Sequence, residues 1–158
     1  MSILRFHLMI GAPGSGKSHI VKILAPLIKA EIISTDQIRK KLYGDESNQG
    51  DWNEIKSVID NNLDEAIAKK KSVILDSTHA YRKWRLAYTQ NLNKVEQIEW
   101  IGWILTTEKS ICLSWNKKRT KIVPKPIIDE YYAAINDKYF GPIRGEGFST
   151  LIKINPAK

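Results

Sequence analysis

Residues 11–18 of the chain read Gly-Ala-Pro-Gly-Ser-Gly-Lys-Ser, which fits the pattern G-x-x-x-x-G-K-[S/T] of a phosphate-binding loop. In such a loop the backbone N–H groups surround phosphate oxygens, and the following helix directs the positive end of its dipole at them. Lys17 is expected to reach the β- and γ-phosphates, and the Ser18 hydroxyl to ligate Mg²⁺. We therefore expect ATP or another nucleoside triphosphate to bind along this segment: Gly11, Ala12, Pro13, Gly14, Ser15, Gly16, Lys17, Ser18 and His19.

Apolar and helix-like segments alternate along the chain. The loop follows an apolar run over residues 3–10 and precedes a helix-like segment over 19–28. Further apolar runs, which we expect to be strands, cover residues 31–34, 72–76, 98–105 and 150–154. Apolar residues spaced by three and four predict helix faces from Trp52 to Ile67 and from Ile127 to Tyr139. The alternation predicts an α/β fold, a P-loop NTPase three-layer sandwich with a mainly parallel sheet of about five strands.

Length and composition set bounds on the class of protein. The chain has 158 residues, which suits a single domain over residues 1–158. Its net charge is +8, which fits either a polyanionic partner such as nucleic acid or ordinary surface charge around a nucleotide site. Cys112, the only cysteine, excludes an internal disulfide and is expected to pack in the interior. No apolar run approaches the roughly 18 residues of a membrane span and no signal peptide is visible, so we expect a cytoplasmic protein without membrane contact.

Residues that directly follow the predicted strands should meet the phosphate loop, because ligands of such sheets bind beyond the carboxyl ends of the strands. Thr35 follows the second strand and is expected to cap the next helix, with Asp36 in its first turn. Asp36 and Arg39 are neighbours on one helix face. The carboxylate could accept the proton of an attacking hydroxyl, and the guanidinium could bind a substrate phosphate. The alternative is a capping carboxylate with a surface ion pair, but the phosphate loop in the same chain favours an active site.

Asp76 ends the third predicted strand, Val73-Ile74-Leu75-Asp76. A carboxylate at this place can act in the active site, where it ligates Mg²⁺ through water or orients Ser18, or it can be a simple turn residue. We expect the active-site role. His79 follows in the loop and could contact substrate, although a single loop histidine usually has no catalytic role.

Two basic segments have two interpretations each. Residues 116–121 read Asn-Lys-Lys-Arg-Thr-Lys and could supply a lid arginine to a transferred phosphoryl group, or could simply end a helix. Residues 81–88 interleave Arg82, Lys83 and Arg85 with aromatic residues, a combination that could hold single-stranded nucleic acid or form an amphipathic helix. We expect Trp84 in the core and Arg85 as a substrate contact.

These segments, taken in order, resemble the kinase domain of phage and bacterial polynucleotide 5′-hydroxyl kinases, within the AAA_33-like and zeta-toxin-like group of P-loop kinases. The resemblance is carried by the phosphate loop, Ser-Thr-Asp-Gln-Ile-Arg at 34–39, Val-Ile-Leu-Asp-Ser-Thr at 73–78 and Asn-Lys-Lys-Arg at 116–119. It covers most of the chain, from Ile3 to the region of Tyr131.

The resemblance implies a role for several residues. Asp36 would be the general base on a 5′-hydroxyl, Arg39 would hold the adjacent 3′-phosphate, and Arg119 would act on the ATP phosphates from a helical lid at about residues 108–126. Two positions depart from the family pattern. Trp115 stands where the family often has a second lid arginine, and His79 stands where it often has asparagine.

The sequence thus predicts an ATP- and Mg²⁺-dependent kinase that phosphorylates a hydroxyl, with Lys17, Asp36 and Arg119 as catalytic residues and the 5′-end of RNA or DNA as acceptor. Separate end-healing or ligase proteins would be its partners. A small-molecule kinase on the same framework is the second hypothesis. An ATP-binding switch without a transferred substrate is the third, and the pairing of Asp36 with Arg39 argues against it because a switch needs neither.

Overall fold

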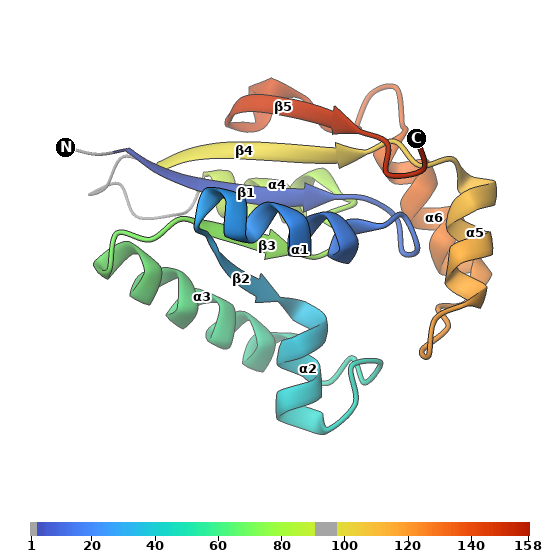
Figure 1. Cartoon of the computed structure of the whole chain (residues 1–158), viewed down its shortest axis with the longest axis horizontal. Coiled ribbons are helices and arrows are strands. Elements are labelled where there is room, and N and C mark those ends of the chain that lie inside the picture. Colours follow the sequence, from blue (N-terminus) through green and yellow to red (C-terminus); the bar gives the residue numbers. More distant parts are fainter. Residues whose placement is uncertain (1–2, 91–97) are drawn as a thin grey trace.

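The structure, a computed structural model, describes residues 3–90 and 98–158. Its centre is a parallel five-stranded sheet in the order β2-β3-β1-β4-β5 (Figure 1). The strands are β1 Leu4–Ile10, β2 Glu31–Ser34, β3 Val73–Asp76, β4 Ile98–Leu105 and β5 Phe148–Ile154. All five predicted strands are confirmed, and the last begins at Phe148 instead of Thr150.

Helices connect the parallel strands. They are α1 Lys17–Ile28, α2 Thr35–Tyr43, α3 Trp52–Ala68, α4 Arg82–Thr89, α5 Lys109–Lys117 and α6 Lys125–Ile135, with a short 3₁₀ helix, η1, at Arg144–Glu146. Within the two described ranges, no helix combines the length and the apolar character needed to cross a membrane.

Successive side chains of a strand point to opposite faces of the sheet. Helices pack against the apolar side chains on both faces. On one face, Met9, Ile74 and Leu105 pack with Val21 and Ala25 of α1, the helix in front of the sheet in Figure 1. A larger cluster on the other face joins strand residues to α2, α3 and α6; it includes Phe6, Leu8, Ile38, Ile55, Ile59, Leu63, Trp100 and Ile135. The predicted three-layer architecture is therefore confirmed.

Helices α5 and α6 lie together beyond the carboxyl ends of the strands (Figure 1). A small apolar cluster of Ala12, Cys112 and Ile128 holds both helices against the phosphate loop. Cys112 is fully buried, so its predicted packing role is confirmed.

Two local predictions are wrong at the residue level. Ser34, not Thr35, caps α2, because its side chain accepts the N–H of Gln37 at 3.3 Å. The helix predicted to include Tyr139 ends at Ile135. Asp137 stops it, because its carboxylate accepts the backbone N–H groups of Tyr139 and the next residue at 2.8 Å each, which replaces the helical hydrogen-bond pattern.

Candidate active site

The phosphate loop joins β1 to α1 at the carboxyl edge of the sheet (Figure 1). Gly14 and Gly16 have φ angles of +81° and +95°, in the left-handed region that favours glycine. A Cβ at Gly14 would collide with the carbonyl oxygen of Cys112 in α5. A Cβ at Gly16 would lie 3.2 Å from Pro156 and 3.3 Å from Trp115. The two glycines thus let the lid helix and the C-terminal segment approach the loop closely.

The loop and the start of α1 offer unsatisfied polar groups to an anion. Helix α1 begins at Lys17 without a side-chain cap and has no acidic residue in its first turn, so its first N–H groups can bind phosphate. The Ser15 hydroxyl is buried and has no hydrogen-bond partner within the described part of the chain. These groups are what nucleotide phosphates require, so the residues of the loop fit such a ligand.

Lys17 is held by the loop itself. Its Nζ donates hydrogen bonds to the carbonyl oxygens of Gly11 and Ala12, at 2.9 Å each. Burial lowers the pKa of Lys17 to about 8, although the nearby Asp76 carboxylate opposes this shift. A phosphate beside Nζ would favour the charged ammonium form.

Ser18 and Asp76 form the part of the site that can hold a divalent cation. The Ser18 hydroxyl donates to Asp76 Oδ2 at 3.1 Å, which joins the first turn of α1 to the end of β3. Hydroxyl, carboxylate and phosphate oxygens are the ligands that Mg²⁺ prefers. The donor set fits the cation predicted from the sequence, with Asp76 near enough to act directly or through water.

Four charged side chains from different elements, Lys17, Asp36, Asp76 and Arg119, lie within electrostatic reach of one another. Burial raises the pKa of Asp76; the charges of Lys17 and Arg119 lower it, and the charge of Asp36 raises it further. The same Arg119 and Asp36 also act on Lys17, in opposite directions. Lys17, Asp36 and Arg119, the three residues predicted from the sequence to be catalytic, all act electrostatically on Asp76 or on each other, and their catalytic role stays a prediction.

Asp36 and Arg39 form the ion pair expected from their spacing. Arg39 Nη1 lies 3.1 Å from Asp36 Oδ1, with the arginine side chain 15% and the aspartate side chain 50% exposed. The carboxylate is therefore open to an incoming group. The Nε of Arg39 is buried and has no hydrogen-bond partner among the described residues.

Arg119, the predicted lid arginine, lies in a closed loop between α5 and α6. The buried Asn116 side chain brackets this loop, because its Nδ2 donates to the Val123 carbonyl at 2.8 Å and its Oδ1 accepts the Val123 N–H at 3.0 Å. The Arg119 N–H also donates to the Asn116 carbonyl at 3.1 Å. At the start of the lid, the Thr107 hydroxyl donates to the Ser15 carbonyl at 2.7 Å. The sequence assigned no role to Asn116 or Thr107; Thr107 lies just after a strand, where a polar residue meets the site.

The lid also touches the irregular segment after α2. Lys121 Nζ lies 3.5 Å from Asp45 Oδ2, and both side chains are largely exposed. An exposed pair of this kind contributes less than about 1 kcal/mol, so it can open at little cost.

Arg85 does not have the predicted role. Its side chain is fully buried, and its Nε and Nη2 donate to the two carboxylate oxygens of Glu146 at 2.8 Å. Its other hydrogen bonds go to the carbonyl oxygens of His79, Ala80 and Phe140. All the N–H donors of the guanidinium are used, so none remains for a substrate.

His79 is likewise an interior residue. It is 4% exposed, and its Nδ1 lies 2.7 Å from the Met9 carbonyl oxygen. Burial lowers the pKa of His79 to about 4, so it is neutral at pH 7 and supports the strand β1 instead of contacting substrate.

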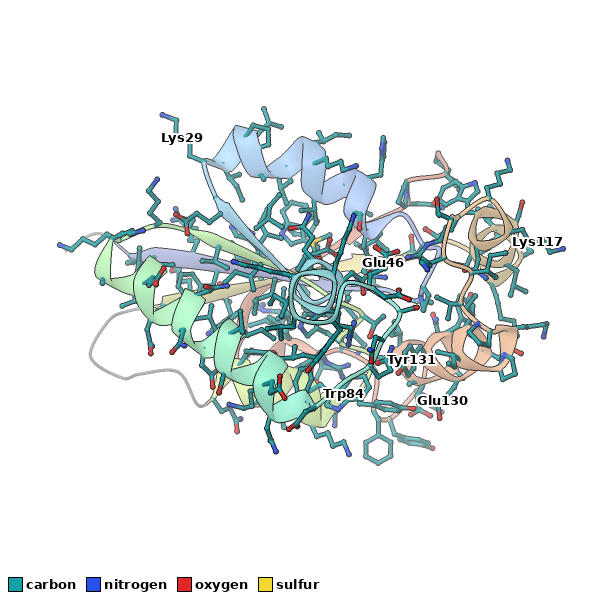
Figure 2. The ribbon with its side chains drawn as sticks, turned by 90° about the horizontal axis from the view of Figure 1, so that it is seen from below. Lys29, Glu46, Trp84, Lys117, Glu130 and Tyr131 are labelled. Carbon is teal, nitrogen blue, oxygen red and sulfur yellow. The ribbon has the colours of Figure 1, made fainter. Side chains whose placement is uncertain are left out.

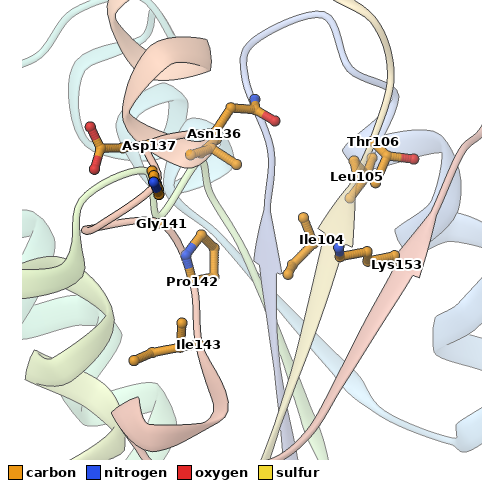
Figure 3. Close-up of a pocket in the computed structure, with 11 residues that line it drawn as sticks. Ile104, Leu105, Thr106, Asn136, Asp137, Gly141, Pro142, Ile143 and Lys153 are labelled. Carbon is orange, nitrogen blue, oxygen red and sulfur yellow. The ribbon is translucent and has the colours of Figure 1, made fainter.

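A cavity of about 270 Å³ lies away from this site, between the ends of β4 and β5 and the segment after α6 (Figure 3). Ile104 and Lys153 line one side, and Pro142 and Ile143 line the other. None of its lining residues belongs to the phosphate loop or the Asp36–Arg39 pair.

Comparison with protein families identifies the chain. Residues 6–139 match the family described as AAA domain, AAA_33. The chain belongs to this family. Its fold is that of a P-loop kinase domain, and the phosphate loop, Asp36 and Arg119 lie within the matched residues. No curated protein sequence matches the chain significantly.

Solved structures share the fold at low sequence identity. A gluconokinase from Sinorhizobium meliloti 1021 has a TM-score of 0.60 and 18% identity, over 96% of this chain and 82% of the other. A chain of the Pnkp1/Rnl/Hen1 RNA repair complex has a TM-score of 0.69 and 17% identity, over 85% of this chain and 45% of the other. A fungal RNA kinase has a TM-score of 0.62 and 14% identity, over 98% of this chain and 38% of the other. Kinases of nucleic acids and of a metabolite are thus both structurally similar to this chain.

Proposed function

We propose that the chain transfers the γ-phosphate of ATP to the 5′-hydroxyl end of RNA or DNA. The observation that carries the proposal is the ion pair between the half-exposed Asp36 and Arg39, placed within electrostatic range of the phosphate loop. A carboxylate and a phosphate-binding guanidinium side by side suit an acceptor that carries both a hydroxyl and a nearby phosphate. A polynucleotide end is such an acceptor.

In the proposed reaction, the 5′-oxygen forms a bond to the γ-phosphorus while the bond from that phosphorus to the β–γ bridging oxygen breaks, and ADP leaves. The hydroxyl proton passes to the Asp36 carboxylate. Lys17 and Arg119 stabilise the negative charge on the transferred group and on the leaving oxygen. Ser18 and Asp76 would hold Mg²⁺, which supplies charge neutralisation on the phosphates when bound.

The product suggests the biological setting. A 5′-phosphate is the end that nucleic-acid ligases join, so the expected partners are end-healing or ligase proteins, in line with the RNA repair complex that contains a structurally similar chain. We propose a cytoplasmic reaction, since it consumes ATP and the chain keeps its single cysteine as a free, buried thiol.

The alternative proposal is a metabolite kinase, which the structural similarity to a gluconokinase favours. A panel of acceptors separates the two: γ-labelled ATP is offered with 5′-hydroxyl RNA, 5′-hydroxyl DNA, gluconate and other small alcohols. Lys17→Ala, purified in parallel, controls for contaminating kinases. Label on the oligonucleotides supports the first proposal. Efficient label on a small alcohol with none on the polymers supports the second.

A further inference from the structure

Three aromatic side chains form a cluster between α4 and α6. Tyr81 and Trp84 come from the start of α4, and Tyr131 comes from α6. Their ring centroids lie 4.6, 5.8 and 5.9 Å apart, with interplanar angles of 83° to 88°. Each pair is therefore packed edge to face, and no ring is stacked on another. Figure 2 shows Trp84 and Tyr131 side by side, with Glu130 next to them.

The cluster is only partly buried. All three side chains are of intermediate exposure, while Trp84 and Tyr131 rest on the main apolar cluster that also contains Ile38 of α2. Tyr81 follows the end of β3, and α6 lies beyond the carboxyl ends of the strands (Figure 1), so the cluster lies at the same edge of the sheet as Asp36 and Arg39. Consistently, the positive charge of Arg39 opposes the burial that raises the pKa of Tyr131, which means that the two side chains lie within electrostatic reach.

Arg39 has capacity for a ligand at this place. Only its Nη1 is bonded to Asp36, at 3.1 Å, and its buried Nε has no hydrogen-bond partner in the described part of the chain. A guanidinium with spare donors near partly exposed aromatic rings matches a phosphate attached to a flat apolar group. Small polyhydroxy acids match it poorly, because they need hydrogen-bonding groups where this surface presents rings.

From this arrangement we propose that the aromatic cluster of Tyr81, Trp84 and Tyr131 is a stacking platform for the 5′-terminal base of a polynucleotide acceptor. The inference rests on the proposed function and adds how the acceptor is recognised. The terminal base stacks on the cluster, its 3′-phosphate binds Arg39, and its 5′-hydroxyl faces Asp36. Stacking on an aromatic side chain tolerates every base, so the platform selects a nucleic-acid end without selecting its sequence.

The test compares two 5′-hydroxyl oligonucleotides that differ only at the first nucleotide, one with a normal base and one abasic. For the wild-type protein, KM of the abasic substrate should be about 5- to 150-fold higher, the range expected for one stacked base. Tyr131→Leu should raise KM for the normal substrate and leave KM for the abasic one nearly unchanged. The ratio of the two KM values should therefore fall toward one. Tyr131→Phe keeps the ring and should keep the preference, which guards against a variant that merely folds poorly.

Tyr139→Leu is the matched control, because Tyr139 is 72% exposed and lies outside the cluster. This variant should keep the wild-type ratio of KM values between the abasic and the normal oligonucleotide. Equal KM values for both oligonucleotides in the wild-type protein would overturn the platform while leaving the proposed function intact, since both ends are still phosphorylated. An equal loss on both substrates in Tyr131→Leu would also overturn it, as that pattern indicates a structural role. If neither oligonucleotide is phosphorylated, the proposed function fails and the platform with it.

Discussion

Arg85 and Glu146 form a buried two-pronged ion pair, with Nε–Oε1 and Nη2–Oε2 distances of 2.8 Å and side-chain exposures of 0% and 2%. Glu146 also accepts a hydrogen bond from Arg82 Nε at 2.7 Å. The pair ties α4 to η1, which leads into the edge strand β5. It is a structural element and not part of substrate binding.

The first prediction concerns stability. Arg85→Ala should lower the free energy of unfolding by about 3–5 kcal/mol, because it leaves the Glu146 carboxylate buried and without its main partner. Urea unfolding followed by circular dichroism measures the change. Lys83→Ala, on the exposed side of the same helix, should stay within about 0.5 kcal/mol of the wild type. A similar small effect for Arg85→Ala would mean that the buried pair does not form.

The second prediction concerns the phosphate loop. Lys17→Ala should abolish detectable turnover and leave the fold intact, since within the described part of the chain the Lys17 ammonium group bonds only to carbonyl oxygens of its own loop. Phosphoryl transfer and thermal unfolding are measured on the same preparation. Near wild-type activity in the folded variant would refute the assignment of the nucleotide site.

The third prediction concerns the lid. Arg119→Ala should reduce kcat by about 10³-fold, because a lid arginine acts mainly on the charge of the transition state. KM for ATP should change much less. Lys118→Ala, the neighbouring exposed cation, is the control and should lose little. A loss in Arg119→Ala smaller than about threefold would remove Arg119 from the active site.

The fourth prediction separates the two members of the acceptor pair. Asp36→Asn should lower kcat by about 10²-fold or more, as expected for loss of a general base. Arg39→Ala should instead weaken oligonucleotide binding and flatten its dependence on salt, because fewer phosphate contacts release fewer counterions. Titrations at several salt concentrations measure the slope. Equal slopes for Arg39→Ala and the wild type would show that Arg39 does not bind phosphate.

The fifth prediction concerns pH. Burial lowers the pKa values of His7 and His79 to about 4, below the ordinary value of 6.5. The unfolded chain therefore binds protons near pH 6.5 that the folded protein does not, so stability is full above this pH and falls as the pH drops toward 4. Each histidine can contribute up to about 3 kcal/mol of this loss.

Urea unfolding at pH 7 and at pH 4.5 checks this expectation. His79→Gln should reduce the pH dependence, whereas His19→Gln, at an exposed position of α1, should preserve it. An unchanged pH dependence in His79→Gln would show that His79 is not a buried neutral group in the folded protein.

The sequence by itself determined the order of strands and helices along the chain and the candidate residues of the site. The phosphate loop, the strands and the Asp36–Arg39 pair are local patterns, since a loop, an apolar run and an i,i+3 spacing each need only neighbouring residues. Placement of Asp36 and Asp76 beside the loop followed from one rule, that parallel strands present their carboxyl ends at one edge.

Only the tertiary structure decided which distant side chains meet. Arg85 and Glu146 are far apart in sequence, and a basic residue in an amphipathic helix looks the same whether it faces solvent or a buried carboxylate. Tyr131 joins Tyr81 and Trp84 only because α6 packs beside α4. Helix ends such as Ser34 and Asp137 depend on single side-chain hydrogen bonds. Long-range contacts are selected by the packing of the whole chain, which no local pattern encodes.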